Sequence, residues 1–198
     1  MCNCFLSLIR DGLKRISAKW MMLATMCLSG LCASCVSEAL HRVDDDGTLV
    51  TVGQMLPDFS VGVHGADTLH TVSLSGKPSV LVFFNTSCSD CRSELPVVNK
   101  LYEEYADRVT FLCISRAEEE ESVSAFWQSH HLSLPFSAQK DRSVYALFAL
   151  HGIPRIYVSD ASLRVSSVIA EKVGEKALRG SIEAVLHSSG GEDGARVR

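Results

Sequence analysis

Hydrophobic and polar positions alternate along the chain in a way that predicts strands and helices in turn. Two continuous apolar runs, at residues 80–84 and 109–114, are typical of strands buried on both faces of a sheet. Over residues 91–105, apolar side chains recur three or four positions apart, which places them on one face of a helix. A strand, a helix and a second strand in this order predict a right-handed crossover between two parallel strands.

The second half of the chain continues the alternation. The expected elements are helices over residues 119–130, 143–150 and 176–186 and strands over residues 156–158 and 163–169. Residues 159–162, Ser-Asp-Ala-Ser, are turn formers that make the two strands an antiparallel hairpin. The whole pattern predicts an α/β fold in which helices flank both faces of a mixed central sheet.

The first 35 residues resemble an export segment. Residues 10–19 hold four basic side chains and one acid, and the next 18 residues, 20–37, carry no charge. A basic start, an apolar run and small residues at its end describe a secretory signal. Residues 31–35, Leu-Cys-Ala-Ser-Cys, resemble a bacterial lipoprotein box in which Cys35 would be the lipidated first residue of the mature chain. A plain cleaved signal peptide and an uncleaved membrane anchor remain open alternatives.

Composition sets the remaining boundaries. Residues 36–52 are polar and irregular, which predicts a flexible tether, and residues 53–187 carry the periodic pattern of one domain. Residues 188–198 are rich in Ser, Gly and charges, which predicts a disordered tail. The acidic run at residues 118–121 is interpreted as a solvated helix start.

Charge and export together indicate the partners. The chain has 19 Lys and Arg against 23 Asp and Glu, a net charge of −4, and no basic stripe, so nucleic acid is not an expected partner. We expect a monomer in the cell envelope or periplasm, lipid-anchored or otherwise tethered to the membrane through its N-terminus.

Cys88-Ser89-Asp90-Cys91 is the motif that carries chemistry. It follows a buried strand and opens a helix, whose N-terminal N–H groups and positive dipole end stabilise a thiolate. Cys88, at the exposed end, would attack a partner's disulfide, and Cys91, in the first turn, would resolve the mixed disulfide. Half of a zinc site and a structural disulfide are the alternatives, although zinc needs four ligands and so short a loop stabilises little. Cys113 is expected to be a small buried hydrophobe.

Residues 82–96, Val-Phe-Phe-Asn-Thr-Ser-Cys-Ser-Asp-Cys-Arg-Ser-Glu-Leu-Pro, resemble the active-site segment of the thioredoxin superfamily. Their last five residues resemble the TlpA/ResA-like branch, exported thiol–disulfide oxidoreductases often tethered to bacterial membranes. Residues 152–154, Gly-Ile-Pro, resemble the cis-proline loop of the family, and residues 53–59 resemble its N-terminal opening segment. The resemblance spans residues 53–187 and implies a thioredoxin-like fold.

The resemblance also implies roles for single residues. Pro154 would be cis and pack beside the disulfide, with an ordinary trans proline as the alternative, and Ile153 would offer its backbone to an extended substrate. Glu94, three residues after Cys91, would accept and return the proton of that thiol, unless it is merely an exposed helix glutamate. Ser87 stands where the family usually has Trp, so the substrate-contacting rim would be more polar.

The expected partners and direction complete this interpretation. The substrates would be disulfides or thiols of exported proteins, and electrons would come from a membrane dithiol relay or a thioredoxin-like donor. No metal is expected, and no cofactor other than a redox-active disulfide between Cys88 and Cys91. The negative charge of Asp90, at about 7 Å and an effective dielectric constant of about 40, disfavours a thiolate by roughly 1 kcal/mol. This favours the disulfide form and hence a reductase.

Two other functions remain as alternatives. A peroxidase of the same superfamily would resemble Pro-x-x-x-Thr/Ser-x-x-Cys, but Asn85 and Leu81 stand at the two diagnostic positions before Cys88. A non-catalytic thioredoxin-fold binding module is the other alternative, and the presence of both cysteines argues against it.

Overall fold

The computed structural model of the chain describes residues 46–170, 172 and 174–189. The expected export segment with Cys35, the first ten residues of the expected tether and the tail from residue 190 onward lie outside these ranges.

A five-stranded mixed sheet forms the centre of the domain, in the order β5-β4-β3-β6-β7. Its strands are β3 (Ser79–Phe84), β4 (Thr110–Ser115), β5 (Phe136–Ser137), β6 (Arg155–Ser159) and β7 (Val165–Ala170). The strand β4 runs parallel to β3 and β5, whereas β6 runs antiparallel to β3 and β7. The predicted parallel crossover and the predicted antiparallel hairpin are both confirmed.

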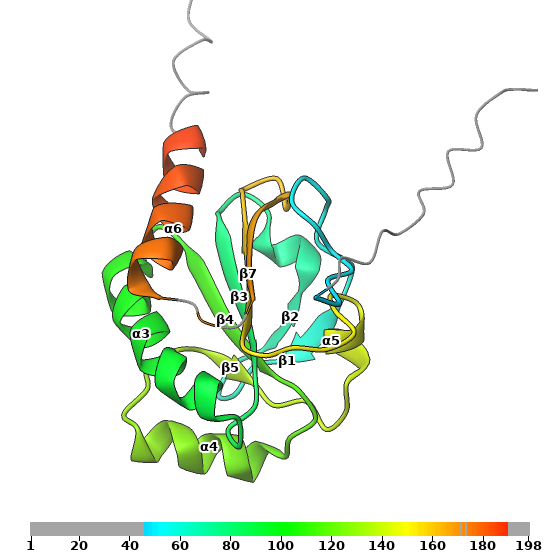
Figure 1. Cartoon of the computed structure of the whole chain (residues 1–198), viewed down its shortest axis with the longest axis vertical. Coiled ribbons are helices and arrows are strands. Elements are labelled where there is room, and N and C mark those ends of the chain that lie inside the picture. The colour runs from blue at the N-terminus through cyan, green and yellow to red at the C-terminus, as the bar shows by residue number, and fades with distance from the viewer. Residues whose placement is uncertain (1–45, 171, 173, 190–198) are drawn as a thin grey trace, which may run out of the picture. The chain divides into compact units, whose positions relative to one another are not determined.

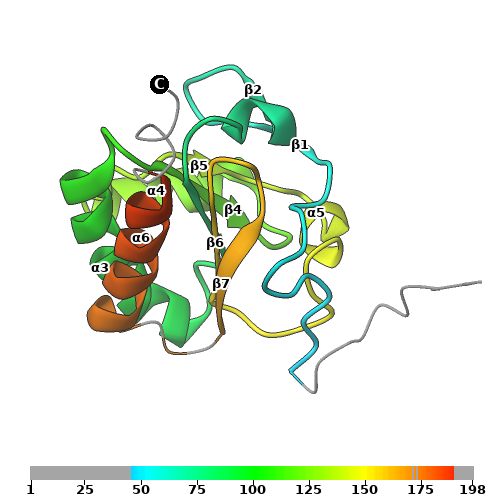
Figure 2. The ribbon, with the colours of Figure 1, turned by 90° about the horizontal axis from the view of Figure 1, so that it is seen from above.

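Helices cover both faces of this sheet, as predicted. The long helices are α3 (Ser89–Tyr105), α4 (Glu120–Ser129) and α6 (Glu175–Ser189). Figure 2 shows them on one side of the sheet, opposite the short helix α5 (Ser143–Ala146) and the hairpin β1 (Ser60–Gly62) and β2 (Thr68–His70). The 3-10 helix η2 (Thr71–Leu74) lies on the side of α5 (Figure 1).

Strand β3 shows why two layers form. All six of its side chains are buried, and successive residues point to opposite faces. Val80, Val82 and Phe84 enter the core under α3 and α6, whereas Leu81 and Phe83 enter the core under α5. The continuous apolar run is therefore the signature of a strand covered on both sides.

The helix expected over residues 143–150 is one turn long. Beyond Ala146 the backbone pairs with the N-terminal part of the domain and the helix ends. The Leu150 N–H, for example, donates to the Gly47 carbonyl oxygen at 2.9 Å. The strands β1, β2 and β5 were not predicted, since two or three residues are too few to show a period.

The expected flexible tether is wrong for residues 46–52. Thr48 and Val50 are each only 3% exposed, and the N–H groups of Leu49 and Val50 donate to the Phe148 carbonyl oxygen. Two polar residues of this segment, Asp46 and Thr48, bind the buried side chain of Arg155. The domain therefore begins at or before residue 46. No helix within the described ranges is long and apolar enough to cross a membrane.

Candidate redox site

The two cysteines lie where β3 passes into α3. Cys88 is the N-cap residue of α3, and its carbonyl oxygen accepts the Arg92 N–H at 3.0 Å. The Cys88 N–H donates to the Asn85 carbonyl oxygen at 3.1 Å, which closes a tight turn after the strand. Cys88 is half-buried and Cys91 is fully buried in the first turn of the helix, and both are free thiols. The sequence predicted this difference in exposure.

The Gly-Ile-Pro loop comes to the same place from the other end of the chain. The Ile153–Pro154 peptide bond is cis, as expected, and Pro154 is buried. The Cys88 thiol donates to the Ile153 carbonyl oxygen at 3.7 Å, although the two residues are 65 positions apart. The fold therefore unites three of the predicted site residues, Cys88, Ile153 and Pro154, at one end of the inner strands β3 and β6.

The environment of Cys91 favours its protonated form. Burial raises the pKa of the Cys91 thiol well above its usual range, and the neighbouring Cys88 raises it further. A hydrogen bond with the Asn85 backbone and the positive charge of Arg116 act in the opposite direction. Burial likewise raises the pKa of Cys113, which is enclosed in β4 as the expected small hydrophobe. Cys91 therefore needs a proton acceptor before it can act as a nucleophile.

Ser87 and Glu94 are less engaged than the cysteines. Ser87 is exposed, and both its N–H, at 2.9 Å, and its hydroxyl donate to the Asn85 side-chain oxygen. Glu94 is half-buried one turn after Cys91, and its carboxylate makes no hydrogen bond or ion pair with the part of the chain that the structure describes. Its carboxylate is thus uncommitted, and its role as a proton acceptor stays a prediction.

Arg116 was missed by the sequence analysis. It directly follows β4, and its N–H donates to the Phe84 carbonyl oxygen at 2.8 Å. Its guanidinium carbon lies 5.3 Å from the centre of the Tyr145 ring, and its buried Nε has no hydrogen-bond partner among the described residues. Because β3 and β4 end side by side, a charged residue after the second strand faces the motif after the first, which is the signal that could have revealed it.

Glu118 is a second missed residue. Its carboxylate accepts the Thr86 N–H at 3.0 Å and the Thr86 hydroxyl, so it holds the loop that leads into Cys88. The acidic run at residues 118–121 is therefore more than a solvated helix start. The helix α4 begins only at Glu120, whose carboxylate accepts from or pairs with His64 at 2.6 Å. Within the described ranges, no three His, Cys, Asp or Glu side chains are placed to hold a metal ion.

Comparisons with known proteins agree with this geometry. The AhpC/TSA family profile matches residues 52–172, which is more than half of the chain. The thioredoxin-like protein YneN of Bacillus subtilis is 31% identical over 111 residues, which cover 54% of this chain and 65% of that protein. The alignment thus spans slightly less than two thirds of YneN.

Two further comparisons concern named thiol–disulfide proteins. The thiol–disulfide oxidoreductase ResA of Oceanobacillus iheyensis is 26% identical over 144 residues, covering 70% of this chain and 75% of that protein. The crystal structure of a thiol:disulfide interchange protein of the thioredoxin family from Chlorobium tepidum matches with a TM-score of 0.61 and 25% identity, covering 69% of this chain and 98% of that chain. The chain therefore belongs to the AhpC/TSA family, as a thioredoxin-like thiol–disulfide oxidoreductase.

Proposed function

We propose that this oxidoreductase acts in the cell envelope, where a Cys88/Cys91 dithiol reduces disulfides of exported proteins. The observation that carries the proposal is the asymmetry of the pair. Cys88 is partly accessible at the N-cap of α3 beside the Ile153 carbonyl, whereas Cys91 is enclosed behind it. An accessible thiol suits attack on a partner, and an enclosed neighbour suits the resolving step.

The exchange proceeds in two balanced steps. The Cys88 thiolate attacks one sulfur of the substrate disulfide, forms a mixed disulfide and releases the other substrate sulfur as a thiolate. Cys91 then gives up its proton, attacks the Cys88 sulfur and releases the second substrate thiolate. The substrate gains two electrons and ends as a dithiol, and the enzyme ends with a Cys88–Cys91 disulfide. Glu94 is the proposed acceptor of the Cys91 proton.

The same proposal includes the substrate surface and the return of electrons. An extended segment of the substrate lies against the backbone of Ile153 and Pro154, with Ser87 at the rim. A membrane dithiol relay or a thioredoxin-like donor returns two electrons to the Cys88–Cys91 disulfide. The proposed location rests on the basic and then apolar character of the first 35 residues, with Cys35 as the candidate for lipidation. Disulfide substrates persist in such exported compartments.

A redox titration of the purified full-length chain tests the proposal. Free thiols are trapped at each potential and counted by mass. We expect a reversible two-electron transition on Cys88 and Cys91 below about −200 mV, since reductases such as thioredoxin lie near −270 mV. A transition near about −120 mV would assign an oxidant instead. If Cys88 and Cys91 never form a disulfide, the proposal is wrong and the non-catalytic binding module is the remaining alternative.

Two variants and one substrate assay separate the roles. Cys91→Ser should accumulate a mixed disulfide with a model disulfide, and Cys88→Ser should form none. Consumption of hydrogen peroxide by the wild type, with dithiothreitol as reductant, would favour the peroxidase alternative. Glu94→Gln should slow resolution and shift its pH profile, whereas the rate of attack by Cys88 should stay unchanged.

A further inference from the structure

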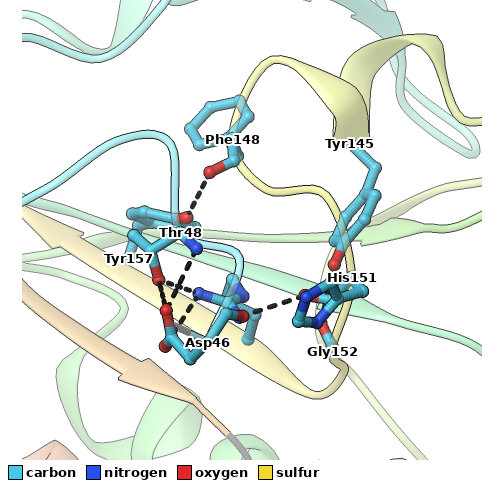
Figure 3. Close-up of polar contacts among 8 residues, drawn as sticks. Asp46, Thr48, Tyr145, Phe148, His151, Gly152 and Tyr157 are labelled. Atoms are coloured by element: carbon cyan, nitrogen blue, oxygen red, sulfur yellow. Dashed lines mark hydrogen bonds and ion pairs between the residues drawn. The ribbon is translucent and has the colours of Figure 1, made fainter. Parts of the chain in front are cut away.

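Arg155 directly follows Pro154 and is the largest fully buried side chain among the described residues, with 1% exposed. Its guanidinium is met by oxygens from two segments. Nη2 donates to the Asp46 carbonyl oxygen at 2.8 Å and to the His151 carbonyl oxygen at 3.1 Å. Nη1 donates to the Thr48 hydroxyl and pairs with the Asp46 carboxylate at 3.4 Å. Figure 3 shows Asp46, Thr48 and His151, which supply these oxygens, lying close together.

The contacts of Arg155 also hold the two ends of the cis-proline loop together. Arg155 ends the loop and His151 begins it, so the bond between them brackets residues 152–154. The Tyr145 hydroxyl also donates to the Gly152 carbonyl oxygen, at 2.7 Å. A Cβ added to Gly152 would lie 3.1 Å from Nη2, so the guanidinium packs closely under the loop. The loop therefore cannot move without disturbing Arg155.

Residues 46–48, which we call the strap, fix the guanidinium in turn. The Thr48 N–H, at 3.0 Å, and the Thr48 hydroxyl, at 2.6 Å, both donate to the Asp46 carboxylate. Gly47 has a φ of +78°, and a Cβ on it would lie 2.8 Å from His151 Nε2, so only a glycine allows this approach. The strap thus touches both ends of the cis-proline loop, and it precedes the region that the family profile matches.

A buried guanidinium is unfavourable unless its contacts compensate for lost hydration, so an apolar residue would fill this position more easily. The Arg155 Nε has no partner among the described residues, so the compensation is incomplete. The arrangement links the strap rigidly to the cis-proline loop. The Ile153 carbonyl oxygen of that loop lies beside the Cys88 sulfur. Such a link can affect reactivity because it fixes the position of a group beside a reacting atom.

We propose that Arg155 and the strap are positioning elements that hold the Ile153 carbonyl against Cys88 and so set the reactivity of that thiol. The proposal rests on the proposed function, because it assigns Cys88 as the attacking thiol. The effect is exerted through the loop, since neither Arg155 nor the strap makes a hydrogen bond with Cys88.

The test compares Arg155→Met, Arg155→Lys and Thr48→Val with the wild type in the full-length reduced protein. Arg164→Met is the matched control, because Arg164 also donates to a backbone carbonyl, that of Gly53, but makes no hydrogen bond with residues 151–155. The measurements are the alkylation rate of Cys88 by iodoacetamide across pH 5–10, the rate of reaction with a model disulfide, and the thermal midpoint of each variant.

We expect Arg155→Met to change the disulfide reaction rate by about tenfold and to shift the pH profile of alkylation, with Thr48→Val in the same direction but weaker. Arg155→Lys keeps the charge with fewer donors and should fall between. The control should keep both the wild-type rate and profile. If the variants lose thermal stability alone, with rates and profiles unchanged, the proposal is wrong and the link is only structural.

Thr48→Val keeps the proposal testable if Arg155→Met does not fold, because it removes one oxygen acceptor and preserves side-chain shape. A wild-type Cys88 that does not react with disulfides would overturn the proposed function itself. A reactive wild type with unaltered variants would overturn only the positioning role.

Discussion

The Cys88 thiol lies 3.7 Å from the carbonyl oxygen of Ile153, its acceptor across the site. This contact joins the start of α3 to the loop before β6, so the half-buried sulfur and the proposed substrate-binding backbone face each other. Cys91 lies on the enclosed side, where burial raises its pKa. The two thiols of one short motif therefore have different environments. Three substitutions near the motif and a rise in pH have predictable results.

Arg116→Met should slow the resolving step. The positive charge of Arg116 lowers the pKa of Cys91, against the larger effect of burial, so its loss should reduce the thiolate fraction. We expect the rate to fall about tenfold for each pKa unit by which the Cys91 pKa rises when this charge is lost. The decay of a mixed disulfide between Cys88 and 2-nitro-5-thiobenzoate measures this rate.

Arg108→Met is the matched control for Arg116→Met. Arg108 also lies over a tyrosine ring, that of Tyr105 at 5.0 Å, but at the far end of α3. It should leave the decay of the mixed disulfide unchanged. Equal rates in the wild type and Arg116→Met would show that the charge has no influence on Cys91.

Glu118→Ala should destabilise the loop that carries Cys88. The Thr86 N–H and hydroxyl lose their shared acceptor, which costs about 1–3 kcal/mol for partly buried donors. Urea unfolding measures the loss. Glu119→Ala is the control, because the ion pair of Glu119 with Lys140, at 3.3 Å, is exposed and should contribute at most about 1 kcal/mol. Equal losses in the two variants would contradict the anchoring role of Glu118.

Periodicity predicted the long elements because each buries a full face. The strand β3 has no exposed side chain, and the apolar positions of α6 at Leu178, Ile182 and Val185 lie in one core. The one-turn helix α5 and the three-residue strands β1 and β2 depend on contacts with distant segments. Local sequence contains no record of those contacts, so the two strands and the early end of α5 could not be predicted, although a helix was expected to start at residue 143.

The residues of the site also differ in whether their partners are near or far in the sequence. Cys88 and Cys91 are neighbours in sequence, so spacing alone placed them at a helix start. Arg155 binds Asp46 across 109 positions, and Asn85 binds the carbonyl oxygen of Arg116 across 31. An arginine at the start of an apolar strand gives no sign that it is buried. Only the folded structure shows which polar residues form hydrogen bonds with Arg155.

Asp90→Asn should make the dithiol a weaker reductant. Asp90 is exposed in the first turn of α3, between the two cysteines of the motif. We expect its negative charge to disfavour a nearby thiolate. Removing a repulsion of roughly 1 kcal/mol should raise the midpoint potential by about 20 mV. Titration against a glutathione buffer at low ionic strength measures the shift, which should shrink in high salt because exposed charges are screened.

Asp107→Asn serves as the comparison for Asp90→Asn, because it removes an exposed acid just beyond the other end of α3. Its potential should equal that of the wild type. A fall in the potential of Asp90→Asn would reverse the sign of the charge argument and remove one reason for assigning a reductase.

Alkaline pH should destabilise the reduced protein. Burial raises the pKa of Cys91 and Cys113 above the ordinary value of 9.0, so the folded state keeps protons that the unfolded chain loses. The stabilisation from these neutral thiols is complete below about pH 9 and is lost as the pH rises further, by up to about 1.4 kcal/mol per pH unit for each thiol. Cys113→Ala should remove one of these contributions, and oxidation of Cys91 to a disulfide with Cys88 should remove the other. Urea unfolding from pH 8 to pH 10 measures the slope, and a slope that is identical in all three forms would mean that neither thiol titrates differently on unfolding.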